Sequence, residues 1–230
     1  MPIEDPRTEN KVWYLRQNRL FARASDEAIA SGLEIFTTTI FPARSLVFEQ
    51  GDVDRVVFLI KRGKVRISRR TIDGKEVTVA VLGAGDIFGE ETLFSGGPRA
   101  TVAMCLEESL LCTSKASDLF ALLHEDPTLA LNVAQILSER LGDASEAMED
   151  LAYARVTDRL MHLFQRLASE HGRPIDAGSL IDVRLTHSDL ASLVGSTRET
   201  VSLELANLTG AGRLATSGRR FVLPHAELPS

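Results

Sequence analysis

The sequence is poor in cysteine and has no long apolar run, and both absences narrow what the protein can be. Its two cysteines, Cys105 and Cys112, lack metal-ligand spacing, and its five histidines are scattered. We therefore expect no disulfide framework, metal site, iron-sulfur cluster or haem. No apolar stretch reaches the roughly 18 residues that span a bilayer. Residues 1–11 are polar and acidic rather than a signal sequence, so we expect a cytoplasmic protein without membrane attachment.

Catalytic patterns are also absent. No nucleophile stands in a recognisable arrangement with a base, and the adjacent Glu90 and Glu91 would point to opposite faces of a strand, so we expect no enzymatic activity. The 230 residues suit two small domains better than one large domain. With 44% hydrophobic and 25% charged residues, the composition is that of an ordinary globular protein.

The net charge of −6 argues against a nucleic-acid partner, because affinity for DNA depends on basic residues that face phosphates. The charge is unevenly distributed, however. Residues 152–230 hold nine arginines and eight acidic residues, whereas residues 1–151 hold 17 basic and 24 acidic residues. All five lysines lie before residue 116, so the cations of the C-terminal part are arginines, which suit bidentate contacts to guanine or phosphate.

The hydrophobic pattern divides the chain into three regions. A helical pattern over residues 11–33, with Ser25 as an N-cap, is followed over residues 35–114 by short runs rich in Val, Ile, Phe and Thr. Turns separate these runs every 8 to 12 residues or so, which is typical of a β sandwich or barrel. After residue 115 the pattern is helical again, and residues 171–179 are expected to form a loop.

The long helical pattern carries one regular apolar stripe. The stripe consists of Leu137, Leu141, Ala144, Met148 and Leu151, spaced 4, 3, 4, 3. This heptad spacing favours a parallel dimer helix. The alternative is that the stripe packs on the β-rich region of the same chain.

The C-terminal segment has the spacing of a helix-turn-helix. Thr186 precedes a short helical pattern, Gly195 permits a turn with positive φ, and residues 197–208 form a second helical pattern. Ser196 and Glu199 fit a capping box that would start this second helix.

The exposed first turn of the second helix fits the major groove of DNA. Arg198 can donate two hydrogen bonds to guanine, and Glu199 can accept one from cytosine. A turn at residues 216–218 and a following strand would form a wing whose arginines lie near phosphates. The expected DNA-binding residues are Ser196, Arg198, Glu199, Ser202, Arg219 and Arg220. Each alone has a plainer interpretation as a cap or a solvated charge.

A second candidate site lies at residues 85–101. Backbone N–H groups after Gly89 could bind an anion, Glu90 could accept from sugar hydroxyls, and Arg99 could bind a phosphate. An arginine buried in a β domain needs an anionic partner, which a phosphodiester would supply. The alternative is that Arg99 pairs with Glu90 or Glu91.

These residues resemble the cyclic-AMP receptor protein and fumarate-nitrate regulator (CRP/FNR) superfamily of bacterial transcription factors, and the cyclic-AMP receptor branch most closely. The resemblance covers about residues 18–224. Its motifs are Val47 to Asp52, the Gly63 turn, Gly83 to Glu90, Pro98 to Ala100, and Gly195 to Val201, in family order and spacing.

The resemblance implies an α+β fold with three parts. Residues 1–126 would form N-terminal helices and a jelly-roll-like β-roll that binds an effector. Residues 127–154 would form a dimerisation helix, and residues 155–230 a winged helix-turn-helix. The implied partners are double-stranded DNA, a second copy of the chain and RNA polymerase, which the expected loop at residues 171–179 could contact. An activator is the expected kind of regulator.

The resemblance also implies a cyclic-nucleotide site, with cyclic AMP (cAMP) as the effector. The implied effector-binding residues are Gly89, Glu90, Arg99, Ala100, Arg140 and Ser145. Arg99 would bind the cyclic phosphate and Glu90 the ribose, with Arg140 approaching Glu90. The chain departs from the family at Ala144, which cannot hydrogen-bond a purine, and at Glu91 and Thr92, where apolar and small residues are usual.

For DNA, the resemblance implies a palindrome with TGTGA-like half-sites read by Arg198 and Glu199. Leu203 stands where relatives often have a third arginine, and Glu204 where a buried aliphatic residue is usual. Two alternatives stay open. One is the same fold with a nonfunctional nucleotide pocket and constitutive DNA binding, and the other is a cyclic-nucleotide module that controls an enzyme or channel.

Overall fold

The structure is a computed structural model that describes residues 11–74 and 76–228. The stretch expected not to be a signal sequence, residues 1–11, lies outside these ranges except for Lys11. The chain forms two compact units. The first consists of residues up to 70 together with 81–142, and the second of residues 71–80 together with 143 onward.

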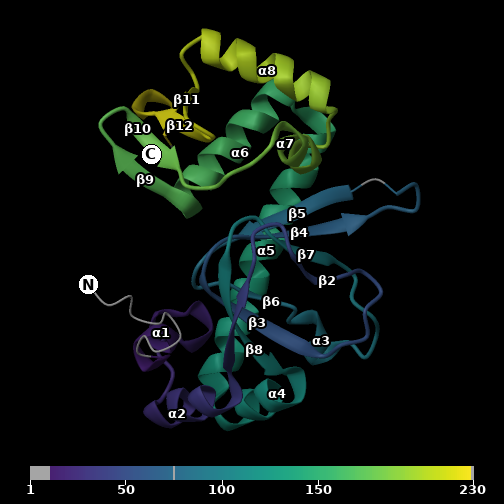
Figure 1. The fold of residues 1–230 in the computed structure, drawn as a ribbon, viewed down its shortest axis with the longest axis vertical. Coiled ribbons are helices and arrows are strands. Elements are labelled where there is room, and N and C mark those ends of the chain that lie inside the picture. The colour runs from purple at the N-terminus through teal and green to yellow at the C-terminus, as the bar shows by residue number, and fades with distance from the viewer. Residues whose placement is uncertain (1–10, 75, 229–230) are drawn as a thin grey trace. The chain divides into compact units, whose positions relative to one another are not determined.

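The first unit is built on a β-roll of two four-stranded sheets (Figure 1). One has the order β1-β8-β3-β6 and the other β2-β7-β4-β5. The strands are β1 Thr37–Phe41, β2 Leu46–Phe48, β3 Val56–Arg62, β4 Val65–Arg70, β5 Glu76–Leu82, β6 Ile87–Phe88, β7 Val102–Cys105 and β8 Ser109–Lys115. Their positions confirm the expected β-rich region, and the tight turns between them include Gly63 at φ +106°.

Strand β3 shows why the roll has two apolar faces. It is a nearly continuous apolar run whose two edges pair with β8 and β6 and whose side chains are buried on both faces of the sheet. Val57 and Leu59 point into a core shared with helices. Phe58, on the opposite face, stacks on Phe88 with ring centroids 4.8 Å apart, and Phe48 lies against both rings.

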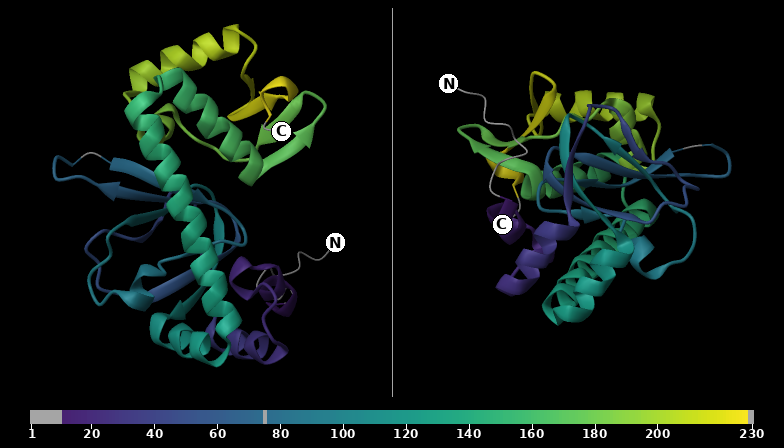
Figure 2. Two further views of the ribbon diagram at one scale, coloured as in Figure 1. Left: turned by 180° about the vertical axis from the view of Figure 1, so that it is seen from behind. Right: turned by 60° about the horizontal axis from the view of Figure 1, so that its bottom comes forward.

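Helices cover one side of the roll. They are α1 Lys11–Gln17, the 3₁₀ turn η1 Arg19–Phe21, α2 Asp26–Ile35, the short α3 Glu91–Phe94, α4 Ala116–Glu125 and the long α5 Pro127–Tyr153. Figure 2 shows the N-terminal half of α5 beside α2 and α4. The expected N-cap is confirmed, since the Ser25 hydroxyl accepts from Ala28 N–H at 3.1 Å.

The second unit combines helices with one more four-stranded sheet, of order β11-β12-β10-β9. Its elements are α6 Val156–His171, β9 Gly172–Ile175, β10 Gly178–Ile181, α7 His187–Val194, α8 Arg198–Gly210, β11 Ala215–Ser217, β12 Arg220–Pro224 and the 3₁₀ turn η2 His225–Glu227. Helix α6 packs on this sheet, with the ring centroids of Phe164 and Phe221 4.9 Å apart. Together the two units confirm the expected α+β fold class.

The prediction of a loop at residues 171–179 is wrong. His171 ends α6 and is buried, and the residues after it form the β9–β10 hairpin. Pro174 is compatible with β9 because β9 is an edge strand and Pro174 lies opposite Ser179 at the end of the sheet.

Residues 71–80 belong to the second unit through a contact with α7 that the sequence pattern did not indicate. The Ser192 hydroxyl accepts from the N–H and the hydroxyl of Thr78 at 2.7 and 2.9 Å. It donates to the Glu76 carbonyl at 2.8 Å. One hydroxyl thus uses its donor and both acceptor positions to attach the start of β5 to α7.

Candidate functional site

Arg99 lies inside the β-roll and is the centre of the first candidate site. Its side chain has no exposed surface. The guanidinium carbon lies 4.1 Å from the centroid of the Phe48 ring and 5.9 Å from that of Phe58, so the cation rests on the aromatic core. A buried charge of this kind requires anionic or polar partners.

The chain itself supplies those partners. Arg99 Nε and Nη2 donate to the two carboxylate oxygens of Asp54 at 3.1 and 2.7 Å, which is a bidentate ion pair. Nη1 donates to Glu91 Oε1 at 3.3 Å. Nη1 and Nη2 also donate to the carbonyls of Gly89 and Val56, at 3.2 and 2.5 Å.

Asp54 is a residue of this candidate site that sequence reasoning missed, because no motif connects it to Arg99. Of the two carboxylates considered as alternatives, Glu91 pairs with Arg99 and Glu90 does not. Burial is the largest single influence on the pKa of Arg99 and lowers it. The hydrogen bonds and charges of Asp54 and Glu91 together raise that pKa above its ordinary value, so Arg99 remains a cation.

Glu90 belongs to a neighbouring pair. Arg140, on α5, donates to Glu90 Oε1 and to the carbonyl of Ile87, which places it where the resemblance implied. Gly89 has φ +77°, and a Cβ there would lie 2.7 Å from Arg99 Nη1 and 2.9 Å from the Val56 carbonyl oxygen. Only glycine lets the backbone approach the guanidinium this closely.

The residue types therefore suit a cyclic nucleotide, with Arg99 for the phosphate and Glu90 for the ribose, although Arg99 is engaged elsewhere in this structure. Ala100 follows Arg99 and is exposed. Ser145 is exposed on the part of α5 that belongs to the second unit. The roles of these residues in binding stay predictions.

The second candidate site is the pair of helices α7 and α8. Thr186 and Asp189 form a capping box that starts α7, and Gly195 ends it in the left-handed conformation at φ +59°, ψ +49°. The N-cap of α8 is Thr197, whose hydroxyl accepts from Thr200 N–H at 3.2 Å. The expected capping box of Ser196 and Glu199 is therefore wrong, because the N-cap is Thr197, one residue later.

The first turn of α8 presents its polar side chains to solvent. Arg198 and Glu199 are both exposed. Ser202 is half-buried, and its hydroxyl donates to the Arg198 carbonyl at 2.8 Å and lies 2.8 Å from His187 Nδ1. The backbone N–H of Ser196, which lies in the turn before α8, donates to the Ala191 carbonyl at 3.0 Å.

The wing is the β11–β12 hairpin, which turns at Gly218. Arg219 is exposed at this turn. Arg220 is less exposed, because its Nη2 pairs with Asp182 Oδ1 at 2.8 Å. Arg219 is therefore the more accessible of the two expected phosphate contacts.

The expected dimer stripe is exposed in the single chain. Leu141 is 67% exposed and Met148 63%, with Leu137, Ala144 and Leu151 exposed as well. The alternative, in which this stripe packs on the β-roll, does not fit these exposures. The role of the five stripe residues in a dimer stays a prediction.

Comparison with known proteins agrees with this geometry. Residues 38–126 match the cyclic nucleotide-binding domain, and residues 154–228 match the Crp-like helix-turn-helix domain. The cyclic AMP receptor protein of Thermus thermophilus is 31% identical over 86% of this chain and 88% of its own length. The chain belongs to the CRP/FNR family.

Other members of the CRP/FNR family resemble most of the chain. The CRP-like cAMP-activated global transcriptional regulator of Mycobacterium tuberculosis is 29% identical over 90% of this chain and 93% of its own. The structure of the c-di-GMP responsive global regulator CLP from Xanthomonas campestris superposes with a TM-score of 0.75 at 26% identity. This match covers 87% of this chain and 99% of CLP.

Membership in the CRP/FNR family confirms a DNA-binding transcriptional regulator that is not an enzyme. It makes the alternative of an enzyme or channel module wrong. None of the helices within residues 11–74 and 76–228 is long and apolar enough to cross a membrane. In the same ranges, no three His, Cys, Asp or Glu side chains are grouped to hold a metal ion.

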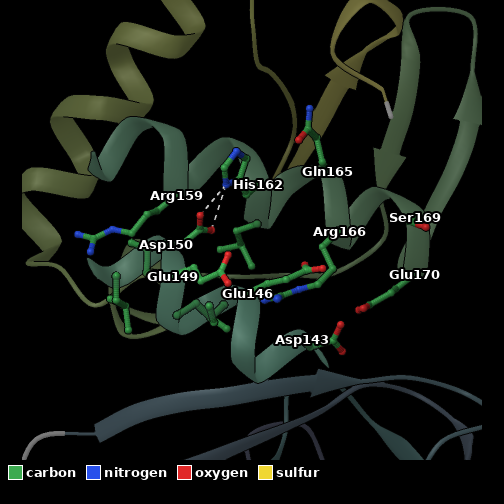
Figure 3. Close-up of a pocket in the computed structure, with 15 residues that line it drawn as sticks. Asp143, Glu146, Glu149, Asp150, Arg159, His162, Gln165, Arg166, Ser169 and Glu170 are labelled. Atoms are coloured by element: carbon green, nitrogen blue, oxygen red, sulfur yellow. Dashed lines mark hydrogen bonds and ion pairs between the residues drawn. The ribbon is translucent and has the colours of Figure 1, made fainter. Parts of the chain in front are cut away.

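This CRP/FNR protein also has a cavity of about 620 Å³ in its second unit, between the end of α5, α6 and α7 (Figure 3). The ionisable residues that line it are Asp143, Glu146, Glu149, Asp150, Glu170, Arg159, His162 and Arg166. His162 Nδ1 lies 2.9 Å from Asp150 Oδ1. Carboxylates outnumber cations here, so the cavity is poorly suited to an anionic nucleotide.

Proposed function

We propose that this CRP/FNR regulator binds a palindromic, TGTGA-like DNA site as a homodimer, and that a cyclic nucleotide, with cAMP as the first candidate, controls this binding at Arg99. RNA polymerase is the proposed further partner, and activation the proposed outcome.

The DNA-reading part of the proposal rests on the exposed start of α8. The Thr197 cap fixes the first turn, from which Arg198 and Glu199 project into solvent. An arginine at this position can bind guanine O6 and N7 together, and a glutamate can accept from the cytosine amino group. This pair of residue types supports guanine and cytosine in the half-site, as in TGTGA.

The dimer is supported by the exposed heptad stripe of α5. A helix that leaves Leu141 and Met148 about two-thirds exposed has apolar surface that a second copy of the same helix would bury. A two-fold dimer would also place two copies of α8 on successive major grooves about 34 Å apart, which matches a palindrome.

The effector proposal is supported by the chemistry of Arg99 and Glu90. A buried cation beside a carboxylate can bind the phosphodiester and ribose of a cyclic nucleotide. The names of the two relatives above refer to cAMP, and that of CLP refers to c-di-GMP. Constitutive DNA binding is the second candidate, and the full engagement of Arg99 by the chain favours it.

The test is a titration of purified protein onto a fluorescent TGTGA palindrome with and without cAMP, with a scrambled duplex as control. We expect tighter binding to the palindrome than to the scrambled duplex, and a further increase with cAMP. Equal affinity for both duplexes would refute the proposed site. Specific binding that cAMP does not change would favour constitutive binding.

A further inference from the structure

The guanidinium of Arg99 has no hydrogen-bond donor left for a ligand. An arginine has five N–H groups, and all five of those on Arg99 are used within the chain: three toward carboxylate oxygens and two toward backbone carbonyls. We propose that Asp54 and Glu91 stand in for the phosphate at Arg99, so that a cyclic nucleotide binds only by displacing them. This inference rests on the proposed nucleotide control of the site.

The five bonds differ in how easily a ligand could replace them. The carbonyls of Val56 and Gly89 are held by the backbone of β3 and of the turn before α3. The carboxylates of Asp54 and Glu91 are on side chains that can rotate. A phosphate could therefore recover Nε and one N–H each of Nη1 and Nη2, which is enough for a bidentate contact.

Exposure indicates which groups would move. The side chain of Asp54 is 38% exposed and that of Glu91 is 32% exposed, whereas that of Arg99 is fully buried. Phe48 holds the guanidinium in place from one face. The two carboxylates thus have access to water and can turn outward, while the cation keeps its position.

The charges at the site require a nucleotide phosphate to displace the carboxylates rather than bind beside them. Arg99 with Asp54 and Glu91 already carries one net negative charge. A phosphodiester brings another, and three anions around one buried guanidinium would repel one another at low local dielectric. The three N–H groups that a phosphate would take are those bound to Asp54 and Glu91, so a bound nucleotide is expected to displace both carboxylates from the guanidinium.

The proposal makes the two acids determinants of nucleotide affinity. Neither acts by touching the nucleotide, since both would leave Arg99 when it binds. The wild-type protein would need a higher nucleotide concentration than the same pocket without these charges.

The test compares Asp54→Asn, Glu91→Gln and the double variant with wild type, using calorimetric titration with cAMP and, in parallel, cyclic GMP. Glu108→Gln is the matched control, because it removes one charge from an exposed pair with Arg62 in the same unit. Hydrogen bonds to charged groups are strong enough that we expect the double variant to bind at least about tenfold more tightly. The affinity of each single variant for cAMP should lie between those of wild type and the double variant, and the affinity of the control should match that of wild type.

Thermal unfolding of the same proteins provides a second readout. Without nucleotide, the double variant should melt lower than wild type, since a buried arginine has lost its counter-ions. Added cAMP should raise its melting temperature more than that of wild type, because at a given ligand concentration the stabilisation of the folded state grows with the logarithm of the ligand's affinity. If the double variant does not fold, the two single variants carry the same comparison.

Affinity that is unchanged or weaker in the carboxylate variants, or no nucleotide binding by any of the proteins, would overturn this inference. DNA titrations on the palindrome separate this failure from that of the proposed function. If wild type binds both the palindrome and cAMP but the variants show no rise in nucleotide affinity, only the role of Asp54 and Glu91 is overturned. If no protein binds nucleotide, the proposed nucleotide control is overturned as well. If wild type does not bind the palindrome more tightly than the scrambled duplex, the proposed function is overturned.

Discussion

Gly195 offers a sharp test of how the helix-turn-helix is built, because two physical terms oppose its replacement by alanine. The residue has φ +59° and ψ +49°, a left-handed conformation that disfavours a side chain. A Cβ at this position would also lie 2.6 Å from Leu151 Cδ2, closer than two carbons can approach. We predict that Gly195→Ala loosens α7 and α8.

The magnitude follows from these two terms. The left-handed conformation costs about 1 to 2 kcal/mol for a residue with a Cβ. The steric term is smaller, because Leu151 is 52% exposed and the end of its side chain can rotate away. The expected total is therefore about 1 to 2 kcal/mol, which corresponds to a factor of about 5 to 30 in an opening equilibrium. Gly195→Asn should cost less, since asparagine tolerates this conformation although it also has a Cβ.

Amide hydrogen exchange followed by mass spectrometry measures this change in the full-length protein. Peptides that cover α7 and α8 should exchange about 5 to 30 times faster in Gly195→Ala than in wild type. The control is Gly210→Ala in the last turn of α8, where a Cβ would meet nothing within 4 Å. That variant should exchange no faster than wild type, because alanine favours a helix more than glycine does. Equal acceleration in both variants, or none in Gly195→Ala, would refute the reasoning.

Three further predictions concern DNA binding, acid stability and assembly. Arg198→Ala should weaken binding to the palindrome by about 1 to 3 kcal/mol with little effect on a scrambled duplex, measured by fluorescence anisotropy; equal loss on both would make Arg198 a phosphate contact. The Asp126 carboxylate accepts from the backbone N–H groups of Ser25 and Thr128, and the bond from Ser25 is the main cause that lowers its pKa. Its contribution to stability is therefore present above about pH 4 and lost as pH falls through the lowered pKa, so Asp126→Asn should flatten this acid loss in urea unfolding. Leu141→Glu should weaken self-association at least about tenfold in analytical ultracentrifugation, because it places a charge in the apolar stripe of α5; an unchanged dimer would place the interface elsewhere.

Local chemistry was sufficient to predict most of the architecture. Short runs of β-branched and aromatic residues between glycine and aspartate turns indicated a β sandwich or barrel, and the family resemblance specified the β-roll. Gly195 identified the turn between α7 and α8. The N-cap of α8 was misplaced by one residue because Ser196 and Thr197 are both good caps. Only the backbone conformation shows that Thr197, at ψ +154°, is the residue that precedes the first helical turn.

The β9–β10 hairpin was missed for a different reason. Proline and glycine usually interrupt strands, and residues 171–179 contain both. Whether such a segment forms a loop or an edge strand depends on whether a strand from another part of the chain pairs with it or with its hairpin partner. Here β12, from the end of the sequence, pairs with β10 and leaves β9 at the edge, where Pro174 is tolerated.

Asp54 shows the limit of motif reasoning at the effector site. Burial of Arg99 in a β domain was enough to predict an anionic partner, but not which anion. The partner lies 45 residues earlier in the sequence, in the segment before β3, where an aspartate looks like an ordinary turn residue. Only the fold brings it to the guanidinium.

Ion pairing also explains how an acidic chain can belong to a DNA-binding family. In the second unit Arg220 is held by Asp182, and Arg213 by Glu227. Arg198 and Arg219 are exposed and form no ion pair among residues 11–74 and 76–228. The residues proposed to contact a DNA duplex are thus a small number of unpaired arginines on α8 and the wing, which the proposed dimer would double. Because base contacts depend on where those few groups stand, the net charge of −6 describes mainly the β-roll and the helices around it, and has little bearing on specific recognition.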